Sequence, residues 1–140
     1  MTRSLIVLLA LIFALPALAE RKHSVGEHEV HYIAFNSSFL QPEIAAAAGL
    51  VRSRAQGVVN VSVLKSGQPV AAQVSGSVKD LLGKDYPLTF KQHKEGDAAI
   101  YYLAQFPFES RETLRFNLNV LPSGSAPINF DFTQEFFPDE

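Results

Sequence analysis

The sequence contains no cysteine, and its single methionine is the initiator. Without cysteine the chain cannot form disulfides, supply a thiolate nucleophile or carry an N-terminal lipid. A copper(I) site of the usual kind is also disfavoured, because that ion prefers thioether and thiolate ligands. A folded domain made from this chain must therefore be stabilised by its core alone.

Positive charge is not in excess either. The chain has 12 Lys and Arg residues against 14 Asp and Glu residues, for a formal net charge of −2. Proteins that bind nucleic acids carry a basic face that displaces counterions from the phosphates. We therefore predict no nucleic-acid partner for this protein.

Long apolar runs are confined to the beginning of the chain. Leu5–Leu15 is unbroken and apolar, follows Arg3 and precedes the small residues of Ala17-Leu18-Ala19. At about eleven residues this run is shorter than the roughly 20 residues of a membrane-spanning helix. The arrangement predicts a signal peptide over residues 1–19, cleaved after Ala19, and export to the periplasm. The length of residues 20–140 suits a single domain with no membrane span.

Apolar and polar residues alternate along most of this predicted domain, as is typical of strands with one face on a core. In Glu112–Leu121, for example, Leu114, Phe116 and Leu118 share one face. Gly76 interrupts one such face, which predicts a β-bulge there. The pattern predicts about seven strands, near residues 25–35, 59–63, 70–78, 86–90, 98–106, 112–121 and 128–133.

One segment has helical punctuation instead. Pro42 at a first helical position, Glu43 after it and Gly49 after four alanines predict a short helix over Pro42–Ala48, following the first strand. Short, evenly spaced strands with one such helix predict an all-β fold, an immunoglobulin-like antiparallel β-sandwich. A small β-barrel is the alternative.

No catalytic or metal-binding motif is complete. His28-Glu29-Val30-His31 resembles a zinc-protease motif, but this spacing on a strand places His28 and His31 on opposite faces. A Gly-x-Ser-x-Gly nucleophile elbow is missing from the sequence. We therefore predict no catalytic residue, no metal ligand, no cofactor and no enzymatic activity. A small periplasmic hydrolase that uses scattered acids and His93, or a metal (copper) chaperone, remains the alternative.

The strongest candidate for partner binding lies on both sides of the predicted helix. There the regular strand pattern gives way to irregular sequence, and binding residues are often carried by irregular segments on a rigid scaffold. The guanidinium fork of arginine suits a carboxylate or phosphate partner, although ion pairs within the chain would also account for the arginines. The predicted site consists of Asn36, Ser37, Ser38, Phe39, Arg52 and Arg54.

Several segments, taken in order, resemble a known family. They are Phe35-Asn36-Ser37-Ser38-Phe39-Leu40, Pro42-Glu43, Gly49-Leu50-Val51-Arg52-Ser53, and the strand patterns at 57–63, 101–107 and 112–116. In this order they are similar to the domain-of-unknown-function 4426 family of small secreted proteobacterial proteins, over about Tyr32 to Phe137. The resemblance implies a periplasmic location and an immunoglobulin-like sandwich, and it brings no established activity. Our hypothesis is a non-enzymatic binding or accessory module, whose partner is another periplasmic or envelope protein.

Overall fold

The structure is a computed structural model and describes residues 21–109 and 111–137. The predicted signal peptide lies outside these residues. Within the described ranges, no helix has the length and apolar character needed to cross a bilayer.

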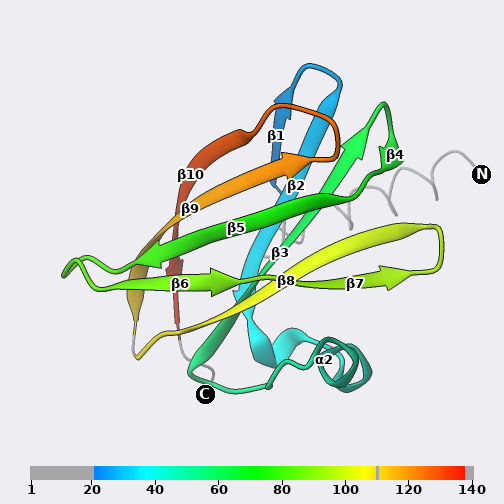
Figure 1. The fold of residues 1–140 in the computed structure, drawn as a ribbon. Coiled ribbons are helices and arrows are strands. Elements are labelled where there is room, and N and C mark those ends of the chain that lie inside the picture. Colours follow the sequence, from blue (N-terminus) through cyan, green and yellow to red (C-terminus); the bar gives the residue numbers. More distant parts are fainter. Residues whose placement is uncertain (1–20, 110, 138–140) are drawn as a thin grey trace, which may run out of the picture.

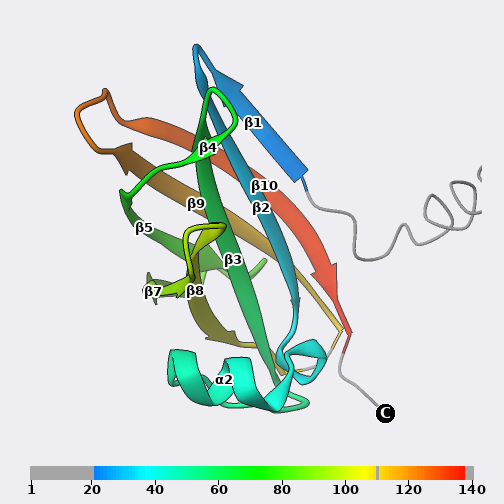
Figure 2. The ribbon, with the colours of Figure 1, turned by 90° about the vertical axis from the view of Figure 1, so that its right-hand side faces the viewer.

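The strands pair in two separate antiparallel sheets that face each other (Figures 1 and 2). The all-β sandwich prediction is therefore confirmed over the closed-sheet alternative. The first sheet contains, in spatial order, β1 (Arg21–Val25), β2 (His28–Asn36), β3 (Gln56–Lys65), β8 (Ala99–Pro107) and β7 (Lys91–Glu95), with β4 (Gln68–Pro69) also on β3. The second contains β10 (Ile128–Phe136), β9 (Glu112–Pro122), β5 (Ala72–Lys79) and β6 (Asp85–Thr89).

The described residues contain ten strands, more than the seven predicted. The single strand predicted at 25–35 is wrong, because the chain turns back at Gly26, where φ is +61°, and Val25 pairs with His28. The predicted strand at 86–90 ends one residue early, and the chain then crosses from β6 in the second sheet to β7 in the first. Alternation shows which way side chains point, but not which sheet a strand joins.

Gly76 does not mark a bulge. The register between β5 and β9 runs without interruption from Ala72 opposite Pro122 to Lys79 opposite Arg115. A Cβ atom at Gly76 would collide with the carbonyl oxygen of Asn117 on β9. Glycine is therefore required for the close approach of the two backbones.

Phenylalanine rings fill the space between the sheets. Phe116 on β9 is fully buried, stacks on Phe132 of β10 with ring centroids 4.6 Å apart, and meets the edge of Phe106 at 5.1 Å. Phe106, on β8 of the first sheet, also packs edge-on against Phe136 of β10 at 5.2 Å. These four rings, hereafter the aromatic layer, join β8 of the first sheet to β9 and β10 of the second.

The predicted helix is confirmed as α2 (Pro42–Ala48), which ends at Gly49 with φ of +69°. It covers the outer face of the first sheet at one end of the molecule (Figure 2). A second apolar cluster fixes it there, formed by Leu40, Ala45, Ala48, Leu50, Val58 and Leu103.

The aromatic layer can be tested by removing one ring. We expect Phe116→Ala to lower the free energy of unfolding by about 3–5 kcal/mol, because burial is lost and a cavity remains. Urea denaturation followed by circular dichroism measures the loss. Phe39→Ala is the matched control, since that side chain is 60% exposed, and its effect should stay within about 0.5 kcal/mol. Equal losses in the two variants would contradict this assignment.

Candidate functional site

The structure brings the two predicted binding segments together. The short 3-10 turn η2 (Ser37–Phe39) follows β2, and residues 51–54 follow α2. The Ser37 hydroxyl donates to the Ser53 carbonyl at 2.9 Å and accepts from the Ser53 amide at 2.8 Å. One step outward, Arg52 Nη2 donates to the Ser38 carbonyl at 2.9 Å. The two segments are thus joined side by side.

Several of the predicted site residues make structural contacts within the chain. Ser37 is fully buried and acts as a clamp between the segments. The Asn36 side-chain amide donates to the carbonyl of Phe137 at 2.8 Å, which ties the end of β2 to the chain beyond β10. Whether these residues also contact a partner stays a prediction.

Beyond the clamp, the same segments carry apolar side chains into solvent. Phe39 is 60% exposed and Val51 is 61% exposed. Gln105 on β8 holds the backbone of Val51 in place, because its amide group accepts from the Val51 N–H at 3.0 Å and donates to the Val51 carbonyl. Arg52 and Arg54 are exposed beside it. We call Phe39, Val51, Arg52 and Arg54 the junction surface.

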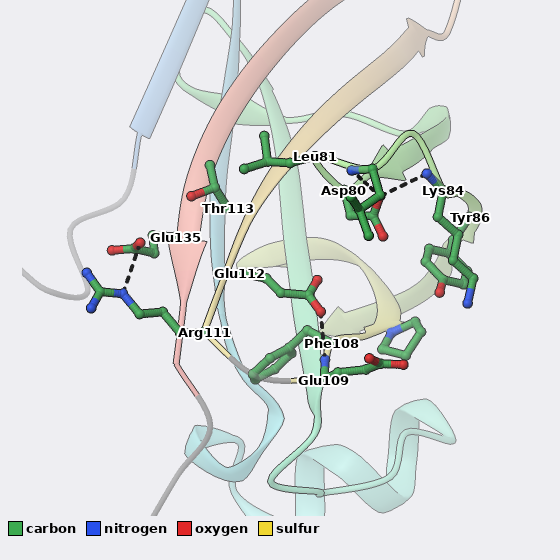
Figure 3. A pocket seen from close by; sticks show the side chains of 12 residues that line it. Asp80, Leu81, Lys84, Tyr86, Phe108, Glu109, Arg111, Glu112, Thr113 and Glu135 are labelled. Carbon is green, nitrogen blue, oxygen red and sulfur yellow. Dashed lines mark hydrogen bonds and ion pairs between the residues drawn. The ribbon is translucent and has the colours of Figure 1, made fainter.

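A cleft of about 630 Å³ lies elsewhere, where sequence reasoning predicted no site. It opens between the β5–β6 loop, residues 80–84, and the chain around the end of β8 and the start of β9 (Figure 3). Its lining includes Leu81 and Leu82 from the loop, and Pro107, Phe108 and Glu109 from the end of β8 and the chain that follows it. This volume is in the range of ligand-binding pockets.

The β5–β6 loop is held by its own hydrogen bonds. The Asp80 carboxylate accepts the amides of Leu82 and Lys84 at 2.9 and 2.8 Å, and the Asp80 carbonyl accepts the Gly83 amide at 3.1 Å. This turn holds Leu81 and Leu82 in solvent, 81% and 95% exposed. The signal in the sequence was two leucines between Asp80 and Gly83, at turn positions that polar residues usually occupy.

Charged side chains of both signs line the cleft. Arg111 pairs with Glu135 at 3.3 Å at one side, and Glu112 Oε1 accepts the amide of Glu109 at 3.1 Å. A hydrogen bond to Tyr86, together with its charge and those of nearby carboxylates, raises the pKa of the Lys84 ammonium above its ordinary value. Lys84 therefore stays charged at neutral pH.

The histidines do not converge. Strand geometry places His28 and His31 on opposite faces of β2, as predicted. On the face of His31, the Lys22 ammonium binds Glu29 at 3.1 Å, and this contact holds the pKa of the Glu29 carboxyl below its ordinary value. Among the residues that the structure describes, no three His, Cys, Asp or Glu side chains form a group that could hold a metal ion.

A family model described as a domain of unknown function, DUF4426, matches residues 22–139. The chain belongs to the DUF4426 family. The resemblance seen in the sequence is thereby confirmed.

Solved structures agree with this DUF4426 fold. A DUF4426 family protein from Pseudomonas aeruginosa PAO1 is 53% identical, with a TM-score of 0.82 over 86% of this chain and 97% of that chain. Two structures of FetP from uropathogenic Escherichia coli strain F11 have TM-scores of 0.63 and 0.56 at 12% and 11% identity. Each FetP match covers 88% of this chain, and 97% and 93% of the respective FetP chains. At such identities the likeness shows the fold alone. No curated protein matches the chain in sequence.

The clamp at Ser37 gives a second prediction. We expect Ser37→Ala to lower the free energy of unfolding by about 1–3 kcal/mol, because the partly buried amide and carbonyl of Ser53 lose their partner. Urea denaturation measures this loss. Ser123→Ala, an exposed serine in the turn between β9 and β10, removes the same hydroxyl and should change little. A stability of Ser37→Ala equal to that of the control would refute the clamp.

Proposed function

We propose that this DUF4426 protein is an exported, non-enzymatic binding module of the periplasm that contacts another envelope protein through the junction surface. The observation that carries the proposal is the pair of exposed apolar side chains on a fixed backbone. Phe39 and Val51 are about 60% exposed, although Gln105, Ser37 and Arg52 hold the segments that carry them.

Such a surface is suited to association. Burying a large apolar side chain contributes about 1.5–3 kcal/mol relative to leaving it in water. Gln105 already fixes the backbone of Val51, so binding costs little additional conformational entropy at this position. Phe39 and Val51 are therefore suitable anchors for a protein interface.

The arginines indicate the chemistry of the partner. Arg52 uses one guanidinium donor for the Ser38 carbonyl, and a guanidinium has five N–H donors in all. Arginine beside apolar anchors is a frequent composition of interface hot spots, and its fork pairs with carboxylates. The expected partner surface is an apolar patch bordered by Asp or Glu side chains.

Two further observations support the periplasm as the compartment. The beginning of the chain has the pattern of a signal peptide. FetP, which shares the fold, was obtained by expression in the periplasm of Escherichia coli. Copper is bound in one FetP structure, but at 11% identity this property belongs to FetP and is not carried over.

A photo-crosslinking amino acid placed at Phe39 tests the surface in intact cells. We expect a defined protein to be captured, because Phe39 would lie inside the interface. The same amino acid at Leu121, which is 38% exposed on β9, should not capture it. Capture of the same proteins from both positions would speak against a specific junction surface.

The captured protein is then used to measure dependence on the junction surface. The double variant Arg52→Glu with Arg54→Glu reverses both charges and also removes the hydrogen bond of Arg52 to the Ser38 carbonyl, so Arg54→Glu alone is measured beside it. Val51→Ser removes an anchor while keeping the backbone contacts of that residue. We expect each to lose most of the capture while the circular dichroism spectrum and the urea midpoint show a folded protein. Undiminished capture by all of these variants would reject the proposal.

A further inference from the structure

The cleft beside the β5–β6 loop combines an apolar wall with an acidic rim. The lining includes the exposed Leu81 and Leu82 of the loop, together with Tyr86, Pro107 and Phe108. Figure 3 shows Leu81, Tyr86 and Phe108 around the cleft. Phe108 is almost fully buried, so the apolar lining continues into the core. The apolar lining of the cleft therefore borders the hydrophobic core at Phe108.

The turn holds Leu81 and Leu82 in positions where most of each side chain is exposed to solvent. Three hydrogen bonds to Asp80 fix the backbone of the turn, and in this conformation both leucine side chains are exposed. Each large apolar side chain that is buried gains roughly 1.5–3 kcal/mol over its exposed state. A rigid turn that keeps two leucines in water does not serve the stability of the isolated domain.

The charges around the cleft favour a cationic occupant. Arg111 is paired with Glu135. The other charged residues of the lining are the carboxylates of Asp80, Glu109 and Glu112 and the ammonium of Lys84. Lys84 Nζ lies over the ring of Tyr86, 5.3 Å from its centroid. The cleft therefore has an excess of negative charge next to its apolar wall.

We propose that this cleft is a docking groove for an extended segment of a partner polypeptide that carries apolar side chains next to Lys or Arg. The apolar side chains enter the cleft and cover Leu81 and Leu82, and the cations meet the carboxylates of Glu109 and Glu112. A small molecule inside the cleft would leave the projecting Leu82 in water. An anionic bilayer or the same face of a second copy would be repelled by the carboxylates.

Contacts connect the groove to Asn36, at the end of β2 before the junction surface, but the two proposals are separate. Arg111, which lines the cleft, lies over the ring of Phe137 at 5.1 Å, and the carbonyl of Phe137 accepts the amide of Asn36. The groove does not depend on the junction surface. Variants at Leu81 or Glu109 leave Phe39 and Arg52 unchanged, so the two proposals can fail independently.

Isotope-labelled protein titrated with a short synthetic peptide of alternating leucine and lysine tests the groove. We expect amide shifts confined to residues 80–86, 108–109 and 111–113. The double variant Leu81→Ser with Leu82→Ser should weaken binding at least about tenfold, because two anchors are lost. It should fold normally, since both side chains are exposed.

Charge is tested with a matched pair of variants. Glu109→Lys should weaken binding of the leucine–lysine peptide by about tenfold, whereas Glu27→Lys, the same change in the exposed β1–β2 turn, should not. A peptide with glutamate in place of lysine, or serine in place of leucine, should bind much more weakly. No binding, shifts located elsewhere, or equal binding of the glutamate peptide would overturn the proposal. Leucine-dependent binding to phosphatidylglycerol vesicles, or leucine-dependent self-association, would also overturn it.

Discussion

The contact between the phenylalanine rings of the two sheets is the interaction on which the rest of the molecule depends. Without cysteine, the sheets are held together by packing and by a few polar contacts at their margins. Of the four rings in the aromatic layer, Phe106 comes from the first sheet, and it meets both Phe116 and Phe136 of the second. Tyr32 on β2 adds a further contact between the sheets, with the ring of Phe132. Gly57 opposite Phe106 on β3 has no room for a side chain, because that ring fills the space. The local sequence of β3 is thus adapted to a ring on its neighbour.

Because the aromatic layer holds the sheets together, the loops can depart from the usual rule that apolar side chains are buried and polar ones exposed. Ser37 is completely buried, whereas Phe39, Leu81 and Leu82 are exposed. A protein selected for stability alone would place these residues the other way round. In each case a short polar side chain, Ser37 or Asp80, fixes the backbone that presents the apolar residue. In these irregular segments, hydrogen bonds involving a hydroxyl or a carboxylate hold the backbone in place, as pairing with a neighbouring strand does in the sheets.

Local features of the chain were predictable, and long-range ones were not. The helix Pro42–Ala48 could be predicted to the residue, because its proline and its left-handed Gly49 are local signals. The inward faces of β9 and β10 followed from alternation. The turn at Gly26 and the crossing between β6 and β7 did not, since alternation carries no information on the pairing partner. The hydrogen bonds between Ser37 and Ser53 and the exposed position of Leu81 and Leu82 could not be predicted either, because both depend on how distant segments pack.

The cleft could not be predicted from the sequence, because it depends on long-range contacts and not on local signals. A pocket needs residues from several parts of the chain, and this one joins the β5–β6 loop to the start of β9 and the end of β10. Contacts between the sheets bring these segments together, because Phe116 on β9 and Phe136 on β10 both pack against Phe106 of the first sheet. The signal for the cleft in the sequence was the pair Leu81 and Leu82 in a turn, where polar residues are usual. Both side chains are exposed, so burial does not account for them. Where the fold itself does not explain such a residue, contact with another molecule is the physical explanation that remains.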